Sequence, residues 1–409
     1  MSNSLRLTVA VGTRPEVVKL APVVSALKAA GHSVRVIATG QHSDPRLAGD
    51  LFRELGCEPD VVWILPEHGE SDRVGALLAH SYDEFCVNRP DALMVLGDTS
   101  SAPLLALAAR RHGIGVIHLE AGLRSFNPRS LEEVNRRSMA ALATVHLAPT
   151  ELAAGLLARE GVAAARIRVV GNPVIDAIVA SGAVPAAPAN RHGVLFTAHR
   201  ATNVDDPQRL LVLEQILRGL VEDHGLVLFP VHPRTRTRLE AAGLWRGLRD
   251  LSGLTMVDPL SYRSLLDRLA SSVVCVTDSG GLQEEASYFG VPVVVMRHTT
   301  PRWEGVVSGA AELTGVDAPR VLAAARRLAE AHVQRRVSSL PCPYGDGRTG
   351  KRVCDALADE ELLSLLAPVE PELLQAIPAE VAEVLDTSKP GLAAFHGVPL
   401  GVVERRGVA

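Results

Sequence analysis

Asp278-Ser-Gly-Gly-Leu-Gln-Glu-Glu285 follows the apolar, β-branched run Val273-Val-Cys-Val-Thr277 and leads into a helical stretch that ends at Gly290. Another apolar strand starts at Val291. A Ser-Gly-Gly turn between a strand and a helix points bare backbone N–H groups and the helix N-terminus at one spot, which favours a bound anion such as a phosphate. A glutamate one turn into the same helix can accept hydrogen bonds from a sugar diol. The stretch therefore predicts a βα unit that binds a phosphorylated sugar or a nucleotide.

Short apolar strands alternate with amphipathic helices along most of the chain, which is the pattern of parallel sheets built from βαβ units. One helix is predicted from Pro15, which suits a first helical position, to about Ala30. The predicted strands form two series, at residues 5–12, 33–39, 60–64, 91–97, 115–120, 145–149 and 166–170, and at 193–198, 226–231, 254–257, 273–277 and 292–296. Small residues and prolines in Ala180–Ala189 are typical of a linker between the two series. We therefore expect two doubly wound α/β domains, with ligands at the carboxyl ends of the strands in the cleft between them.

Composition narrows the class of protein. The 409 residues are 47% hydrophobic and 22% charged, which suits a water-soluble α/β protein of two or three domains. The net charge of −4 is no signature of a polyanion-binding protein, so we expect no nucleic-acid partner. The five cysteines are odd in number and lack CxxC spacing, which argues against disulfides and a structural zinc site and favours a reducing, cytoplasmic location. No leader-like segment and no apolar run of about 18 residues is present, so we expect neither secretion nor a membrane partner.

Charged residues follow several strands of the first series. Arg14 and Lys19 come after the first strand, Asp98 and Glu120 end two other strands, and Glu132 opens a helix. Each has an ordinary interpretation as a surface charge, an N-cap or a complement to a helix dipole. Three carboxylates at the carboxyl edge of one sheet nevertheless favour a shared role as bases or ligand contacts.

The second series carries its own candidates. His199 and His232 each follow a strand that should end at the same edge as Ser279, although a lone histidine is more often structural than catalytic. Arg302 follows another strand and can clamp a diphosphate as a forked donor. No Ser/His/Asp order, metal-ligand spacing or dinucleotide fingerprint stands out, so we expect no metal and no redox cofactor.

The motifs taken together resemble the non-hydrolysing UDP-N-acetylglucosamine 2-epimerases. They run in family order over about residues 6–360 and comprise Val11-Gly-Thr-Arg-Pro-Glu16 with Lys19, Gly40-Gln-His42, Gly97-Asp-Thr99, His118-Leu-Glu-Ala-Gly-Leu-Arg124, Glu132-Glu-Val-Asn-Arg136, Gly171-Asn-Pro-Val-Ile-Asp176, Ala198-His-Arg200, Pro230-Val-His-Pro233, Asp278 to Glu285, and Pro343-Tyr-Gly-Asp-Gly347. The resemblance implies an α/β, GT-B-like fold with two Rossmann-like domains, an active site between them, and usually a homodimer. Together with the linker composition it places the domains at 1–180 and 192–349, with a helix at about 350–365 that crosses back to the first domain. The tail at 366–409 has few periodic features and is predicted to be an appendage.

The resemblance also implies a reaction and a set of residues. Members interconvert UDP-GlcNAc and UDP-ManNAc: a carboxylate removes the C2 proton while UDP leaves C1, and UDP then re-adds to the resulting glycal. The residues matched to catalysis are Asp98, Glu120, Glu132, His199 and Lys19. The residues matched to substrate binding are Arg14, His232, Ser279, Gly280, Gly281, Glu285 and Arg302.

Several positions depart from the family pattern. Leu260 and Leu265 stand where relatives offer a Gln and a Phe around the uracil, and Pro301-Arg-Trp-Glu304 replaces Glu-Arg-Pro-Glu. Leu131 replaces the usual Pro before the paired glutamates, and Ser43-Asp-Pro-Arg46 differs where some relatives bind an allosteric substrate. The nucleobase, the exact sugar and any allostery are therefore left open.

Other functions stay open at this point. A hydrolysing 2-epimerase would release UDP and free sugar, a GT-B glycosyltransferase would pass the sugar to an acceptor, and a catalytically inactive protein would only bind the nucleotide sugar. The Glu120-Ala-Gly-Leu-Arg124 form favours the non-hydrolysing branch. Three strand-end carboxylates argue against a transferase, which needs only one general base, and the retained set of catalytic residues argues against a mere binder.

Overall fold

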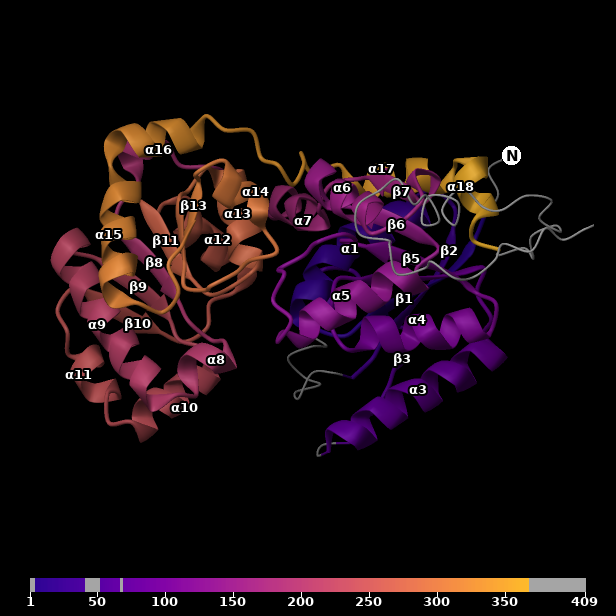
Figure 1. Ribbon diagram of the computed structural model, residues 1–409, viewed down its shortest axis with the longest axis horizontal. Coiled ribbons are helices and arrows are strands. Elements are labelled where there is room, and N and C mark those ends of the chain that lie inside the picture. The colour runs from indigo at the N-terminus through magenta and orange to yellow at the C-terminus, as the bar shows by residue number, and fades with distance from the viewer. Residues whose placement is uncertain (1–3, 41–51, 67–68, 368–409) are drawn as a thin grey trace, which may run out of the picture. The chain divides into compact units, whose positions relative to one another are not determined.

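The computed structural model describes residues 4–40, 52–66 and 69–367. Two parallel sheets, each with the strand order of a doubly wound fold, confirm the predicted α/β class with two Rossmann-like halves (Figure 1). The first sheet has the order β3-β2-β1-β4-β5-β6-β7, and the second has the order β10-β9-β8-β11-β12-β13.

The strands of the first sheet are β1 (Arg6–Val11), β2 (Ser33–Ala38), β3 (Val61–Val62), β4 (Ala92–Leu96), β5 (Gly115–Leu119), β6 (Val145–Ala148) and β7 (Ile167–Val169). The helices between and after them are α1 (Arg14–Ala29), α3 (Glu70–Val87), α4 (Ser101–Arg111), α5 (Leu131–Leu142), α6 (Glu151–Arg159) and α7 (Pro173–Ser181). The strand Ile167–Val169 is preceded by the 3-10 turn Ala164–Arg166. All predicted strands of this series are present, with ends that differ by at most two residues.

The strands of the second sheet are β8 (Val194–Thr197), β9 (Val227–Pro230), β10 (Leu254–Val257), β11 (Val274–Thr277), β12 (Val293–Val295) and β13 (Ala311–Leu313). Its helices are α8 (Ala201–Val204), α9 (Pro207–His224), α10 (Pro233–Ala241), α11 (Trp245–Arg249), α12 (Tyr262–Ala270), α13 (Gly281–Phe289), α14 (Trp303–Val307), α15 (Ala318–Ala329) and α16 (Ala331–Ser338). The sequence pattern did not predict β13, because Ala311-Glu-Leu313 has no run of apolar residues and pairs only at the sheet edge.

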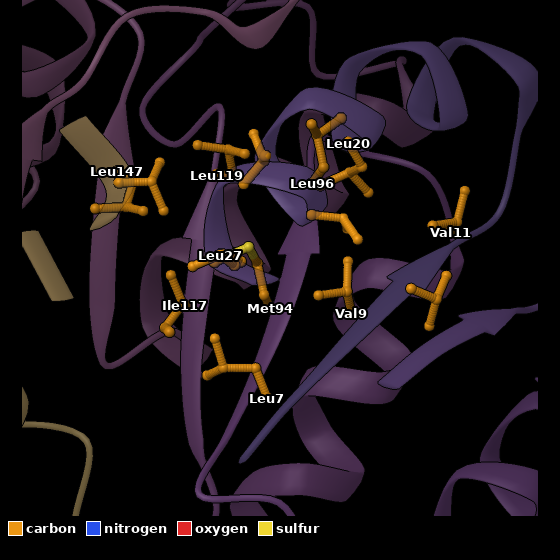
Figure 2. Close-up of a cluster of buried hydrophobic side chains, with 14 of the residues drawn as sticks. Leu7, Val9, Val11, Leu20, Leu27, Met94, Leu96, Ile117, Leu119 and Leu147 are labelled. Atoms are coloured by element: carbon orange, nitrogen blue, oxygen red, sulfur yellow. The ribbon is translucent and has the colours of Figure 1, made fainter. Parts of the chain in front are cut away.

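The two faces of the first sheet pack against different helices. Leu7, Val9 and Val11 of β1 face Leu20 and Leu27 of α1, with side chains of β4, β5 and β6 completing the cluster (Figure 2). The opposite face carries Ala10, Leu93 and Val116, which pack against α3, α4 and α5. Burial on both faces explains why the strands are near-continuous apolar runs rather than alternating ones.

The segment between the two sheets is partly regular. Residues 180–181 still belong to α7, Gly182 ends that helix in a left-handed conformation (φ 71°), and Pro188–Asn190 form a 3-10 turn. The predicted linker is therefore shorter than its composition indicates. The division at residues 180 to 192 into two domains remains a prediction.

After α16 the chain returns to the first sheet. Two helices follow, α17 (Thr349–Leu357) and α18 (Glu360–Ser364), where the sequence predicted one. Val353, Leu357 and Leu362 are buried in the same cluster as α1, and Leu366 still belongs to it. The predicted appendage lies mostly at 368–409, outside the described residues, as does the segment Ser43–Arg46.

Candidate active site

The turn from β11 into α13 has the geometry that the opening stretch predicted. The N–H of Ser279 donates to Thr277 Oγ1 (2.9 Å), and the amide of Leu282 donates to Ser279 Oγ (3.5 Å). Within the described chain the amides of Gly280 and Gly281, at the N-terminus of α13, have no acceptor. We call Ser279–Gly281 the anion turn, because free amides at a helix N-terminus attract negative charge.

Asp278 holds His199 beside this turn. Its buried carboxylate accepts the backbone N–H groups of His199 (3.0 Å) and Arg200 (2.9 Å), and it lies 3.0 Å from His199 Nδ1. Burial alone would raise the pKa of Asp278, but the hydrogen bond and charge of His199 lower it. Asp278 therefore fixes the ring so that Nε2 stays available to a ligand. Asp278 is not among the predicted site residues, although its position at a strand end next to Ser279 indicates such a role.

His232 lies beside His199, with ring centroids 5.8 Å apart. Its Nδ1 accepts the N–H of Arg234 and so caps α10. Burial, and then the neighbouring His199, lower the pKa of His232, so the ring is neutral near pH 7. His232 therefore has a structural role as the cap of α10, and it also lies beside His199.

A buried ion cluster joins the two halves of the chain. It consists of Lys19 on α1, Glu120 after β5, Glu284 on α13 and Arg302 before α14, with Asn172 between the carboxylates. Lys19 Nζ lies 2.6 Å from Glu120 Oε1 and 2.9 Å from Glu284 Oε2. Arg302 donates through Nε to Glu284 Oε1 (2.9 Å), and its Nη2 lies 3.5 Å from Glu120 Oε1. Asn172 Nδ2 donates to both carboxylates, at 2.8 and 3.1 Å.

The charges of this cluster shift one another's pKa values. Burial would raise the pKa of Glu120, but the positive charges of Lys19 and Arg302 hold it at about 2. Burial would lower the pKa of Lys19, but the two carboxylates raise it to about 12. For Glu284 burial outweighs the cations, and its pKa is raised. The predicted residues Lys19, Glu120 and Arg302 therefore meet, together with Glu284 and Asn172, which sequence analysis missed.

Glu120 has a second unusual feature. Its backbone adopts φ 66°, a left-handed conformation that is costly for a residue with a side chain and that often marks functional sites. Oε1 receives the hydrogen bonds of the cluster, whereas Oε2 lies only 3.2 Å from where a Cβ on Gly97 would stand. Gly97 therefore leaves room for the carboxylate, whose free oxygen lies at the end of β4 next to Asp98.

Asp98 and Glu132 line a cavity of about 430 Å³, together with Thr13, Asn135 and residues of α3. Asp98 forms an ion pair with Arg136, and its backbone carbonyl accepts from Asn135 (2.9 Å). Glu132 accepts from Ser130, and its Oε1 lies 3.9 Å from Nη1 of Arg200. Burial would raise the pKa of Glu132, but the hydrogen bond from Ser130 and neighbouring charges lower it.

The paired glutamates at the start of α5 have different surroundings. Glu133 accepts from the backbone N–H (2.7 Å) and the hydroxyl (2.9 Å) of Ser125 and pairs with Arg136 (3.0 Å). These bonds connect Glu133 to the loop that precedes α5. Glu132, which the family resemblance matches to a catalytic role, is the member of the pair that lines the cavity.

Two predicted substrate contacts form no ion pair with the cluster among the described residues. Arg14, the first residue of α1, is exposed and has no ion-pair or side-chain hydrogen-bond partner within the described residues. Glu285 is buried beside Tyr262; burial and then the charge of Glu284 raise the pKa of Glu285 to about 7.

Two features are absent from the residues that the structure describes. None of the helices there is both long and apolar enough to cross a membrane. In the same residues no three His, Cys, Asp or Glu side chains come together in a group that would hold a metal ion.

Known proteins are similar to this chain in sequence and fold. The profile of the UDP-N-acetylglucosamine 2-epimerase family matches residues 25–358. The UDP-N-acetylglucosamine 2-epimerase of Methanocaldococcus jannaschii is 31% identical over 365 residues, which are 85% of this chain and 98% of the relative. The UDP-2,3-diacetamido-2,3-dideoxy-D-glucuronate 2-epimerase of Pseudomonas aeruginosa is 33% identical over 363 residues, which are 87% of this chain and 99% of the relative.

Solved structures of 2-epimerases also have a similar fold. The M. jannaschii UDP-GlcNAc 2-epimerase in complex with UDP-GlcNAc and UDP superposes with a TM-score of 0.75 at 30% identity, over 86% of this chain and 99% of the other. The Neisseria meningitidis UDP-GlcNAc 2-epimerase bound to UDP-GlcNAc gives 0.76 at 27% identity, over 86% and 99%. These matches confirm the resemblance found in the ordered motifs: the chain belongs to the UDP-N-acetylglucosamine 2-epimerase family.

Proposed function

We propose that this chain is a nucleotide-sugar 2-epimerase that interconverts UDP-GlcNAc and UDP-ManNAc, or a closely related pair. The observation that carries the proposal is the contact between the ion cluster and the anion turn. A Cβ on Gly280 would stand 3.1 Å from Nη1 of Arg302, while the same guanidinium lies 3.5 Å from Glu120. A group that can hold a diphosphate therefore adjoins a group that can take a proton. The UDP-GlcNAc bound to solved relatives supports this substrate class.

The reaction balances without an oxidant or reductant. A carboxylate takes the C2 proton, the C2–H electron pair forms the C1–C2 double bond, and the C1–O bond breaks with its electrons going to the diphosphate. The diphosphate then adds back to C1, and a proton returns to C2 on the opposite face. Because the C2 proton is weakly acidic, stabilisation of the leaving diphosphate has to supply much of the rate.

Each proposed role uses a feature of the site. Glu120, Asp98 and Glu132 are the proton-transfer groups, since two faces of C2 need separate donors or acceptors. Lys19 holds Glu120, while His199, Arg302, Arg14 and the anion turn bind the diphosphate. Glu285 accepts from the ribose and His232 supports His199. We propose no metal and no redox cofactor for this chemistry.

Arg302→Ala is expected to weaken UDP binding by about 1.5–3 kcal/mol, roughly 10- to 150-fold, because a charge-assisted forked donor is lost. Isothermal calorimetry with UDP measures the change. Arg327→Ala, which removes an exposed arginine paired with Glu312, is the matched control and should bind as the wild type does. Unchanged affinity in Arg302→Ala would remove Arg302 from the diphosphate site.

The base and the sugar need their own measurement. Leu260 and Leu265 replace the expected Gln and Phe, and a relative at 33% identity is named for a diacetamido glucuronate rather than GlcNAc. Calorimetric titration with UDP, GDP, CDP and ADP tests the base: we expect UDP to bind at least about tenfold more tightly than the other three. Equal affinities would mean that the protein does not distinguish between nucleobases.

Product analysis on UDP-GlcNAc separates the alternatives. An epimerase reaches the same mixture of two nucleotide sugars from either side, a hydrolysing enzyme releases UDP and free sugar in equal amounts, and a glycosyltransferase releases UDP only with an acceptor. We expect the first result, and either of the others would replace the proposal.

We further propose a homodimer in the cytoplasm and domains at 1–180 and 192–349, on the family resemblance and the cysteine pattern.

A further inference from the structure

Glu284 has no part in the reaction described above, yet it is among the most enclosed charges of the site. Its side chain is fully buried, and three groups contact it: Lys19, Arg302 and Asn172. It lies one turn after the anion turn on the same helix, α13. Burying a charged carboxylate costs desolvation free energy, so its presence here favours a functional role for the charge.

Arg302 lies between Glu284, Glu120 and the anion turn. Nε donates to Glu284 at 2.9 Å, and Nη2 lies 3.5 Å from Glu120 Oε1. The guanidinium also packs against Gly280 of the anion turn, where a Cβ would stand 3.1 Å from Nη1 and 3.2 Å from Cζ. The guanidinium therefore adjoins both the anion turn and Glu120, whereas its Nε side is held by Glu284.

We propose that Glu284 is a positioning residue that anchors the Nε side of Arg302, so that a bound diphosphate draws the Nη edge away from Glu120 and leaves Glu120 a stronger base. The inference rests on the proposed function, since it assumes that Glu120 exchanges a proton with C2. It adds a condition to that function: the base gains strength only when the diphosphate is in place.

The charge balance explains why such a device is useful. Without ligand, Lys19 and Arg302 balance Glu120 and Glu284. In that state the pKa of Glu120 is about 2, and a carboxylate so strongly ionised is a poor base for a carbon acid. Competition from a diphosphate for Nη1 and Nη2 weakens one of the two cationic contacts of Glu120.

The other groups around Glu120 are less able to make this change. Lys19 lies within 3 Å of both carboxylates and keeps its place through them. His118 on β5 is buried with its pKa lowered to about 4, chiefly by desolvation, so it is neutral near pH 7. Asn172 carries no charge. Arg302 is thus the cation of the cluster that also adjoins the anion turn.

The first test uses the wild-type protein. The rise of kcat/KM with pH reports the base in the free enzyme, and the rise of kcat reports it in the substrate complex. We expect the rise in kcat at a pH higher by about one unit or more than the rise in kcat/KM, because Glu120 is the stronger base in the complex. Two rises at the same pH would overturn the inference.

The second test is Glu284→Gln, which keeps the shape and removes the charge, so that two cations face Glu120 alone. We expect UDP to bind about threefold more tightly or better, kcat to fall by about 10- to 100-fold, and the rise of kcat to move to lower pH. Damage to the fold would instead weaken UDP binding and leave the position of that rise unchanged. A kcat profile identical to that of the wild type would overturn the inference.

Two variants complete the design. Glu284→Asp restores the charge, so the rise of kcat should return toward its wild-type pH even if KM increases. Glu240→Gln removes an exposed carboxylate paired with Arg236 and should change nothing. Failure of the proposed function shows differently, as no C2 exchange in the wild type; failure of the inference shows as exchange with coincident pH profiles.

Discussion

Glu120→Gln is expected to lower the rate of C2 proton exchange by about 10²–10⁴-fold, the usual loss when a proton-transfer group is removed. A glutamine at this position can keep the hydrogen bond from Lys19 through its amide oxygen but cannot take a proton from carbon. Because Lys19 and Arg302 would then face one carboxylate fewer, UDP should bind at least as tightly as to the wild type. Exchange measured by proton NMR, with calorimetry for UDP, separates the two effects.

Glu132→Gln should give the same pattern, because Glu132 lines the cavity beside Asp98. The matched control is Glu151→Gln, at the exposed start of α6, which should keep full activity. Full exchange activity in both Glu120→Gln and Glu132→Gln would mean that the proton-transfer groups have been assigned to the wrong carboxylates.

Lys19→Met is expected to lower the free energy of unfolding by about 3–5 kcal/mol, the cost of leaving a buried charge without its partner. Methionine fills a similar volume, so the loss comes from the charge rather than from a cavity. Glu120 and Glu284 would lose the cation that both contact within 3 Å. Urea unfolding measures the change.

The comparison variant is Lys351→Met, which removes an exposed lysine from an i,i+4 pair with Asp355 and should cost less than about 1 kcal/mol. A similar small loss in Lys19→Met would show that the cluster does not depend on its lysine.

The pH dependence of the stability follows from Glu120. Because the pKa of Glu120 is held at about 2, below its ordinary value, its contribution to the free energy of unfolding is present near neutral pH and is lost as the pH falls toward 2.

Local sequence features predicted the parts of the site that local chemistry determines. The Ser279-Gly-Gly turn, the strand ends at Asp98 and Glu120 and the start of α1 each depend on a few neighbouring residues, and each is present in the structure. Glycines in turns and polar residues at strand ends can be recognised from the sequence alone.

The rest of the site depends on contacts over long distances in the chain. Lys19 and Glu284 are 265 residues apart, and Asn172 lies between them, so no local pattern pairs these residues. Glu132 and Glu133 cannot be told apart by helix position either. Only the loop at Ser125, which binds Glu133, separates their roles.

The most direct measurement of the central claim is proton NMR of UDP-GlcNAc incubated with the wild-type protein in D₂O. If a carboxylate exchanges the C2 proton while the diphosphate leaves and returns, the C2 proton signal disappears, and signals of a second, C2-epimeric nucleotide sugar appear with deuterium at C2. Retention of the full C2 proton signal with every nucleotide sugar tested would contradict the account and leave a transferase or a nucleotide-sugar-binding protein.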